Sequence, residues 1–204
     1  MSLADLVITH KASLKDAANV FASGGDTELE QHLLTAADDF RRVKPQIQYG
    51  EVTLIADQRA YALPADIGDF KYDTWGQRRK QPWETGYSGR LPRTSLAVVA
   101  GVKKLVLDPA PTQANIDDAG STLPYWHVVP HVIHATDGAQ TTIPLTLRGL
   151  LILRAQVEAM RQLAMRNLAK PVQMVEGFSN QPRNGTASAL YQALSEEFEL
   201  KAAA

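Results

Sequence analysis

The pattern of apolar residues changes twice along this chain of 204 residues, and the two changes constrain its fold. In the first 43 residues, and again from Leu147 onwards, apolar residues recur at intervals of three and four, which places them on one face of a helix. Between these regions, short alternating runs are bounded by proline, glycine and aspartate, a pattern typical of antiparallel strands and turns. The sequence therefore predicts an α+β fold, in which a mainly helical bundle formed by both ends carries an inserted antiparallel β subdomain.

Four helices are expected: two at the N-terminus, then a long and a short one at the C-terminus. Their predicted ranges are residues 3–22, 27–44, 147–168 and 187–201. Ser13 and Asp16 could instead form a capping box, which would start a separate short helix within the first range. Pro171 is expected to end the long helix. The predicted parts are residues 1–50 for the N-terminal helices, 51–143 for the β subdomain and 144–204 for the C-terminal helices.

Three segments between the helices are expected to form strands. Within residues 52–75, two alternating runs flank residues 56–59 and predict a hairpin. The runs on either side of Ala100-Gly101 predict a second hairpin, and residues 112–122 are interpreted as a polar connection. The β-branched and aromatic residues 125–134 predict an edge or bulged strand, because Pro130 cannot donate to a ladder.

Composition and motifs argue against catalytic chemistry. The chain has no cysteine, which excludes a disulfide framework, a thiolate nucleophile and cysteine-ligated metal sites. It has no phosphate-binding loop, no dinucleotide-binding fingerprint and no nucleophile elbow. Its 21 Lys and Arg nearly balance its 22 Asp and Glu, so contact with nucleic acid would need a local basic patch. We expect no enzymatic activity and no cofactor.

The histidines were weighed as metal ligands. His127, His131 and His134 lie within eight residues, and imidazole is a common ligand of zinc. On an unbroken strand the first two share a face and the third lies on the other, although Pro130 could shift this register. We favour packed or solvent-facing histidines over a metal site. His10 lies on the apolar face of its helix and is expected to be a core or interface residue.

No secretory signal and no membrane-spanning segment are expected. The first residues lack a basic leader with an apolar core. The longest apolar-rich run, residues 145–153, is far shorter than the roughly 20 residues that cross a bilayer.

The strongest local signal lies in residues 76–93, which we call the arm, and in Trp75 just before it. Five cations stand against Glu84 alone: Arg78, Arg79, Lys80, Arg90 and Arg93. Three aromatic residues are interleaved with them: Trp75, Trp83 and Tyr87. Such a mixture suits a protein interface, where Trp, Tyr and Arg are the usual anchors, and it also suits nucleic-acid binding. We favour the interface, because no recognised nucleic-acid module accompanies the arm.

The order of these elements brings together several short motifs. They are Tyr61-x-Leu63-Pro64-x-Asp66, the strand ending at residues 105–111, the segment Asp73-Thr74-Trp75-Gly76 and the aromatic strand with Tyr125 and Pro130. Together with the flanking helices, they resemble the head-to-tail adaptor (connector) proteins of tailed bacteriophages across nearly the whole chain. The long arm and the long interval between Pro111 and Tyr125 depart from that family's pattern.

The resemblance implies a structural protein of the virion neck, which is present in the host cytoplasm before the virion assembles. It implies a ring, commonly a dodecamer, which docks on the portal protein and joins the filled capsid to the tail or to the next neck protein, while DNA passes through its channel without sequence-specific contacts. The free subunit can stay monomeric until it meets the portal. A ring needs two different contact surfaces on each subunit, and we expect the arm and the C-terminal helix, with Leu194 and Phe198, to supply them. The alternative is a nucleic-acid-binding module that uses residues 75–93.

Overall fold

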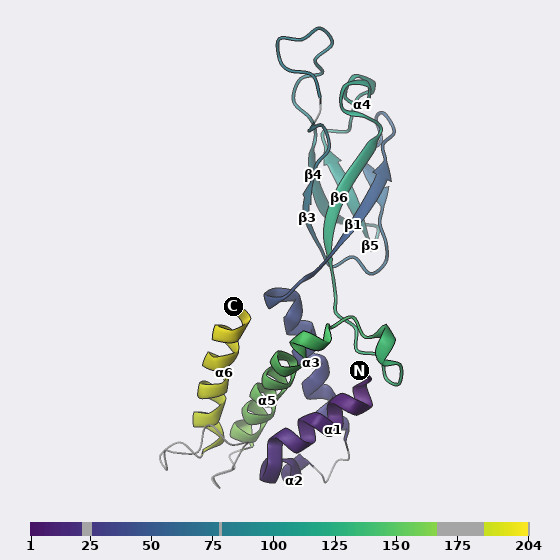
Figure 1. Cartoon of the computed structure of the whole chain (residues 1–204). Helices are drawn as coiled ribbons and strands as arrows, with labels where there is room; N and C mark the ends of the chain where they lie inside the picture. Colours follow the sequence, from purple (N-terminus) through teal and green to yellow (C-terminus); the bar gives the residue numbers. More distant parts are fainter. Residues whose placement is uncertain (22–25, 78, 167–185, 204) are drawn as a thin grey trace. The chain divides into compact units, whose positions relative to one another are not determined.

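The computed structural model describes residues 1–21, 26–77, 79–166 and 186–203, which form two compact units (Figure 1). The helical unit comprises Met1–Lys44 and His131–Ala204, and the β unit comprises Pro45–Pro130. The sequence placed the boundaries near residues 50 and 143. The first strand, however, begins just after Pro45, and the segment after Pro130 belongs to the helical unit because Ile133 and Ile143 are buried in its core. Among the described residues, no helix has the length and apolarity to cross a bilayer.

The helical unit contains the predicted helices, with one interruption. Its α-helices are α1 (Leu3–Leu14), α2 (Ala18–Phe21), α3 (Thr27–Val43), α5 (Arg148–Met165) and α6 (Ala187–Ala203). Three 3-10 turns accompany them: η1 (Lys15–Ala17), η3 (Gly138–Gln140) and η4 (Leu145–Leu147).

The predicted continuous helix over residues 3–22 is therefore wrong. The alternative of a separate short second helix is confirmed by α2, but the capping box proposed to start it is wrong. Ser2 and Asp5 form the capping box that begins α1. The chain breaks at Lys15, whose φ of 47° is not helical, and the Ser13 hydroxyl donates to the carbonyl of His10 instead of capping a new helix. The end predicted at Pro171 lies outside the described residues.

Helix α5 forms the centre of the helical unit. It packs against α1, α3 and α6, so residues from both ends of the chain share one core. The side chains of Leu151, Ala155, Met160 and Leu163 are buried along it. Burying one such Leu or Met side chain contributes roughly 1.5–3 kcal/mol, so the core depends on the two ends of the chain meeting at α5.

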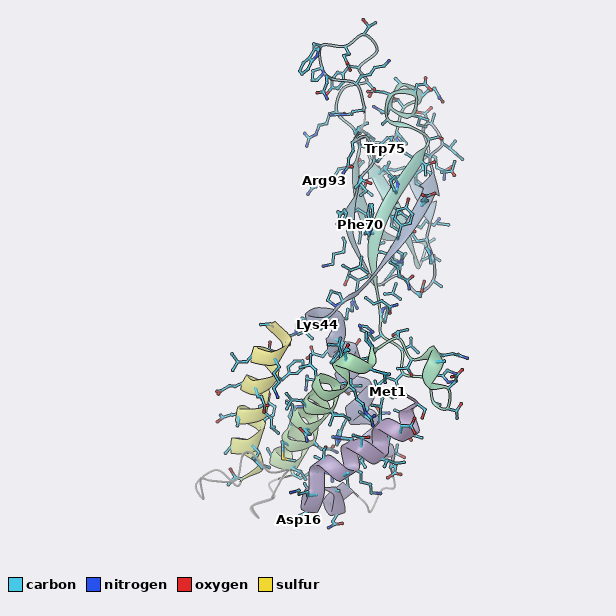
Figure 2. All side chains as sticks on the ribbon, viewed as in Figure 1. Met1, Asp16, Lys44, Phe70, Trp75 and Arg93 are labelled. Carbon is cyan, nitrogen blue, oxygen red and sulfur yellow. The ribbon has the colours of Figure 1, made fainter. Side chains whose placement is uncertain are left out.

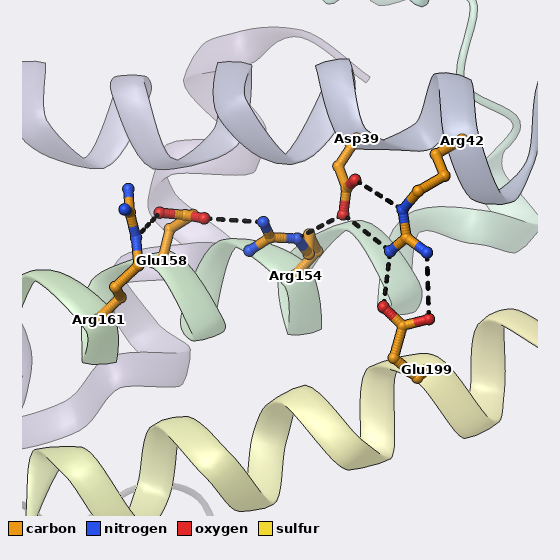
Figure 3. Close-up of polar contacts among 6 residues, drawn as sticks. All are labelled: Asp39, Arg42, Arg154, Glu158, Arg161 and Glu199. Atoms are coloured by element: carbon orange, nitrogen blue, oxygen red, sulfur yellow. Dashed lines mark hydrogen bonds and ion pairs between the residues drawn. The ribbon is translucent and has the colours of Figure 1, made fainter.

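Ion pairs connect α3, α5 and α6 along one side of this core (Figure 3). Arg154 on α5 donates from Nε to Asp39 Oδ2 on α3 at 2.8 Å, and from Nη2 to Glu158 Oε1 at 2.8 Å. Arg42 on α3 donates to both carboxylate oxygens of Glu199 on α6, at 2.6 and 3.3 Å. Burial would raise the pKa of Asp39, but hydrogen bonds from Arg42 and Arg154 outweigh it and lower that pKa, so Asp39 stays ionised.

Two buried histidines lie between α1, α3 and α5. His10 Nε2 and His32 Nδ1 are 3.4 Å apart, and His32 Nε2 is 2.6 Å from Gln162 Oε1. Burial, reinforced by repulsion from His32, lowers the pKa of His10 from 6.5 to about 3, and burial also lowers the pKa of His32. His10 is thus the core histidine that its position on the apolar face predicted.

The β unit consists of two three-stranded antiparallel sheets. One has the strand order β1-β6-β3 and the other β2-β5-β4. The strands are β1 (Gln46–Thr53), β2 (Ala60–Ala62), β3 (Asp69–Asp73), β4 (Arg93–Val99), β5 (Val102–Asp108) and β6 (Thr122–Val129). Buried side chains of both sheets form one core: Leu54, Tyr61, Ile67, Trp75, Leu105, Leu107, Leu123 and Tyr125.

The structure confirms one predicted hairpin and corrects the other. Strands β4 and β5 pair around Ala100 and Gly101, whose φ angles of 52° and 78° suit a tight two-residue turn. Strands β1 and β2 do not pair with each other, because β1 pairs with β6 and β2 with β5. The two runs within residues 52–63 therefore belong to different sheets. The Tyr61 hydroxyl closes the turn between them, because it accepts from the backbone N–H of Ile55 and lies 2.9 Å from Gln58 O and 3.1 Å from Ile55 O, to which its single proton can be donated.

Two further expectations about the β unit were wrong. Strand β6 is the central strand of its sheet and not an edge, and it ends at Val129, so Pro130 lies outside the ladder. Its pairing with β3 is irregular between Phe70 and Tyr72, but the extra residue lies on β3 and not at Pro130. The supposed connection at residues 112–122 contains α4 (Gln113–Ala119), which a reciprocal cap between Thr112 and Asn115 begins.

We expect Arg154→Met to destabilise the helical unit by about 2–4 kcal/mol. The substitution removes the less exposed of the two arginines that contact each of the carboxylates of Asp39 and Glu158, which are largely buried. Arg161→Met is the matched control: Arg161 also contacts Glu158, but its side chain is 55% exposed against 16% for Arg154. Its loss should cost about 0–1 kcal/mol. Urea unfolding followed by circular dichroism measures both, and equal losses would contradict a structural role for the Arg154 network.

Stability should fall as pH drops from about 6.5 towards 3, because the unfolded chain takes up a proton at His10 that the folded chain excludes. Each such histidine adds a slope of about 1.4 kcal/mol per pH unit in this window. We expect His10→Met to flatten the dependence of the unfolding free energy on pH. The control Gln31→Ala, at an exposed position of α3, changes no titratable group and should leave the slope unchanged. An unaltered slope in His10→Met would contradict the exclusion of this proton from the folded chain.

Candidate interface in the beta unit

The arm follows a buried anchor. Trp75 lies in the β unit (Figure 2), where it is buried in the core. Its Nε1 donates to the carbonyl of Gly120 at 2.8 Å. Gly76 follows with a φ of 75°, and a Cβ at this position would lie 2.2 Å from Leu91 Cδ1. The two ends of the arm therefore meet closely, which only glycine permits here.

Asp118 on α4 holds the two sides of the arm together. Its Oδ1 accepts from the backbone of Lys80 at 2.9 Å, and its Oδ2 accepts from the backbone and the hydroxyl of Ser88 at 3.1 and 2.8 Å. The hydrogen bond from Lys80 is the main cause that lowers the pKa of Asp118, so this carboxylate remains charged. The arm is thus a set of turns fixed to α4.

The outer part of the arm exposes aromatic and cationic groups. Trp83 is 81% exposed, and Lys80, Arg90 and Arg93 are also exposed. Arg79 is engaged within the arm, because it donates to Gly89 O at 2.7 Å and lies over the ring of Tyr87 at 5.2 Å. Asp118 adds a second carboxylate beside Glu84, so the patch is less basic than the sequence of the arm alone suggested.

Three of the expected interface residues are packing residues. Trp75 is buried in the β unit, and Leu194 and Phe198 on α6 are buried in the helical unit. Helical spacing correctly predicted an inward face on α6, but that face is covered by this chain and not by a partner. Arg78 lies outside the described residues.

The three neighbouring histidines have separate surroundings. His131 is hydrogen-bonded to Thr142 and to the carbonyl of Lys44, whereas His134 accepts from the backbone of Asp137. His127 is buried beside Tyr125. Across the described parts of the chain, no three histidine, cysteine or acidic side chains are grouped so that they could hold a metal ion.

A pocket of about 240 Å³ lies at the foot of the arm. Its lining residues are Thr74, Trp75, Gly76, Gln77, Ala119, Thr122 and Pro124. None of these side chains is a carboxylate, an imidazole or an amine, so the lining supplies none of the usual general acids or bases.

One exposed cluster was missed in the sequence. Tyr49 on β1, Trp126 on β6 and Tyr72 on β3 lie side by side on the outer side of their sheet. Alternation within residues 46–53 and 122–129 could have indicated which side chains share a face. It could not have brought them together, because that requires the strand order.

Comparisons with known proteins add little. No protein-family model matches this chain, and no curated protein matches it. Among solved structures, a chain from the neck of a native GTA particle, computed with C12 symmetry, is similar over 90% of this chain and 89% of that chain. The identity is 12% and the TM-score is 0.27, so this likeness carries no argument about the present chain.

We expect Asp118→Ala to release the arm from α4, because it removes the acceptor of three hydrogen bonds. Trypsin should then cleave after Lys80 and Arg90 about tenfold faster than in the unaltered chain. A loss of roughly 1.4 kcal/mol of local stability raises the population of the open arm, which trypsin cleaves, by this factor. Asp117→Ala is the control, because the carboxylate of Asp117 accepts a hydrogen bond from Gln113 on the same helix and makes no hydrogen bond to the described part of the arm. Equal cleavage rates in the two variants would contradict the tethering role.

Proposed function

We propose that this chain is a structural adaptor of a phage neck. In this proposal it forms a ring that docks on the portal protein and joins the filled capsid to the tail or the next neck protein, while DNA passes through the channel. It reaches the virion from the host cytoplasm, and its role is structural and not catalytic.

One observation carries the proposal. The two ends of the chain build a single helical core around α5, and an antiparallel β unit is inserted between them. This is the element order on which the resemblance to head-to-tail adaptors rests. The motif residues Tyr61 and Leu105 are core residues of the β unit, as expected of residues that shape a fold.

The exposed chemistry supports an assembly role. Large aromatic side chains that remain more than half exposed in the described chain include Trp83, Tyr49 and Tyr72. Exposed aromatic residues beside arginines are typical anchors of protein interfaces. A subunit of a ring needs two such surfaces, because each of its contacts is heterologous.

Nucleic-acid binding is the second candidate function, and the exposed Trp83 with Lys80, Arg90 and Arg93 favours it. Cations beside aromatic rings suit phosphate contacts and base stacking. Glu84 and the ionised Asp118 within the same patch weaken this candidate, because they repel phosphates.

Mixing the chain with the portal protein of the same phage tests the adaptor role. Native mass spectrometry and negative-stain imaging should show a ring of several copies on the portal, with the chain alone and the portal alone as controls. A chain that remains monomeric and unbound in the presence of the portal would refute it. Titration with labelled duplex DNA tests the second candidate, for which three phosphate contacts predict a salt slope of about −3.

A further inference from the structure

The outer side of the sheet β1-β6-β3 carries a continuous aromatic surface, which we call the aromatic face (Tyr49, Trp126 and Tyr72). The ring of Trp126 is stacked on Tyr72, with centroids 4.9 Å apart, and meets Tyr49 edge-on at 5.2 Å. Tyr49 and Tyr72 are 53% and 51% exposed. Ile47, which precedes Tyr49 by two residues on β1, is also exposed and extends the surface.

This surface does not belong to the core of the β unit. On β6, Leu123 and Tyr125 point into that core, and Trp126 points to the opposite side because side chains alternate along a strand. A contiguous group of exposed apolar rings usually marks an interaction site, since water solvates it poorly. The aromatic face therefore requires an explanation other than folding.

The charges around the aromatic face favour a cationic partner. Tyr49 donates a hydrogen bond to the carboxylate of Glu51, which holds this charge beside the ring. The edge strand β3 adds Asp69, which pairs with Val128 on the Trp126 side of the sheet, and Lys71, whereas β6 carries no Lys, Arg, Asp or Glu. Asp73 does not contribute, because it pairs with Tyr125 on the core side and accepts from the backbone of Trp75. Trp and Tyr rings attract guanidinium groups through their negative faces, and nearby carboxylates strengthen this attraction. The same carboxylates repel a phosphate backbone.

The arm of the same chain offers the matching chemistry. Arg90 and Arg93 are exposed, and among the described residues their guanidinium groups have no hydrogen bond or ion pair. Trp83 supplies a large exposed ring. We propose that the aromatic face receives the arm of a second copy of this chain, with the guanidinium groups of Arg90 and Arg93 against its rings and near Glu51. The inference rests on the proposed ring, for which it names the subunit contact.

Two different surfaces meet in this contact, so it is heterologous. Each copy keeps a free arm and a free aromatic face after it has bound one neighbour, and the assembly continues until it closes. A symmetric dimer through a single patch would end after two copies. This difference allows a test that does not require the portal.

The test mixes two blocked variants of the full chain and follows them by sedimentation velocity over a range of concentrations. One variant, Arg90→Glu with Arg93→Glu, has a blocked arm, and the other, Glu51→Lys with Tyr72→Lys, has a blocked aromatic face. Alone, each should self-associate at least about tenfold more weakly than the unaltered chain, which corresponds to roughly 1.4 kcal/mol. Together they should form a one-to-one dimer that grows no further, because only one arm and one aromatic face remain usable.

A cross-link gives a second readout, because the chain contains no native cysteine. Thr85→Cys in the arm and Lys71→Cys on β3 should form a disulfide between copies when the two variants are mixed. This should occur about tenfold faster than between Thr85→Cys and the exposed control Asp16→Cys in the helical unit. All substituted positions in these variants are exposed, and circular dichroism verifies their folding.

The outcomes separate this contact from the proposed function. A mixture that stays monomeric, with cross-linking no faster than in the control, overturns the contact, whether or not the chain binds the portal. If instead the one-to-one dimer forms but the chain never binds the portal, the contact stands and the adaptor role fails.

Discussion

The packing of α5 against helices from both ends of the chain is the constraint on which the rest of the structure depends. The buried side chains of α5 pack against α1 and α3 from the N-terminal part of the chain and against α6 from its C-terminal part. The chain therefore leaves the helical unit after Lys44 and returns to it at His131. The residues in between, Pro45–Pro130, fold as a unit with a core of their own. The Arg154 and Arg42 ion pairs reinforce this arrangement, because they connect α3 to α5 and α6 beside the same core.

Helical periodicity predicted this arrangement well, whereas strand alternation predicted pairing poorly. Helices α3, α5 and α6 were found from three- and four-residue spacing, because each buries one face along its length. Alternation shows that a segment is a strand but not which strand it pairs with. For this reason the β4–β5 hairpin, whose turn has its own signature, was predicted, and the pairing of β1 with β6 was not.

The candidate interface could be predicted only in part, for a related reason. Exposed arm residues such as Trp83 were identified from composition, since no apolar periodicity accounts for them. Leu194 and Phe198 were identified as inward-facing, but spacing alone does not tell whether a face packs within the chain or against a partner. Asp118 was missed because its contact with Lys80 and Ser88 joins residues about 30 to 40 positions apart.

The near-zero net charge of the chain conceals a separation of cations and carboxylates within the β unit. The exposed cations of the arm and the carboxylates around the aromatic face lie on the same unit, in different segments of the sequence. Complementary charges of this kind select the orientation of two partners more than they add affinity, and the exposed rings supply most of the apolar area. A protein with both surfaces on one unit can bind itself head to tail. Whether such a chain closes into a ring then depends on the rotation that each contact imposes, which is a matter of geometry and not of chemistry.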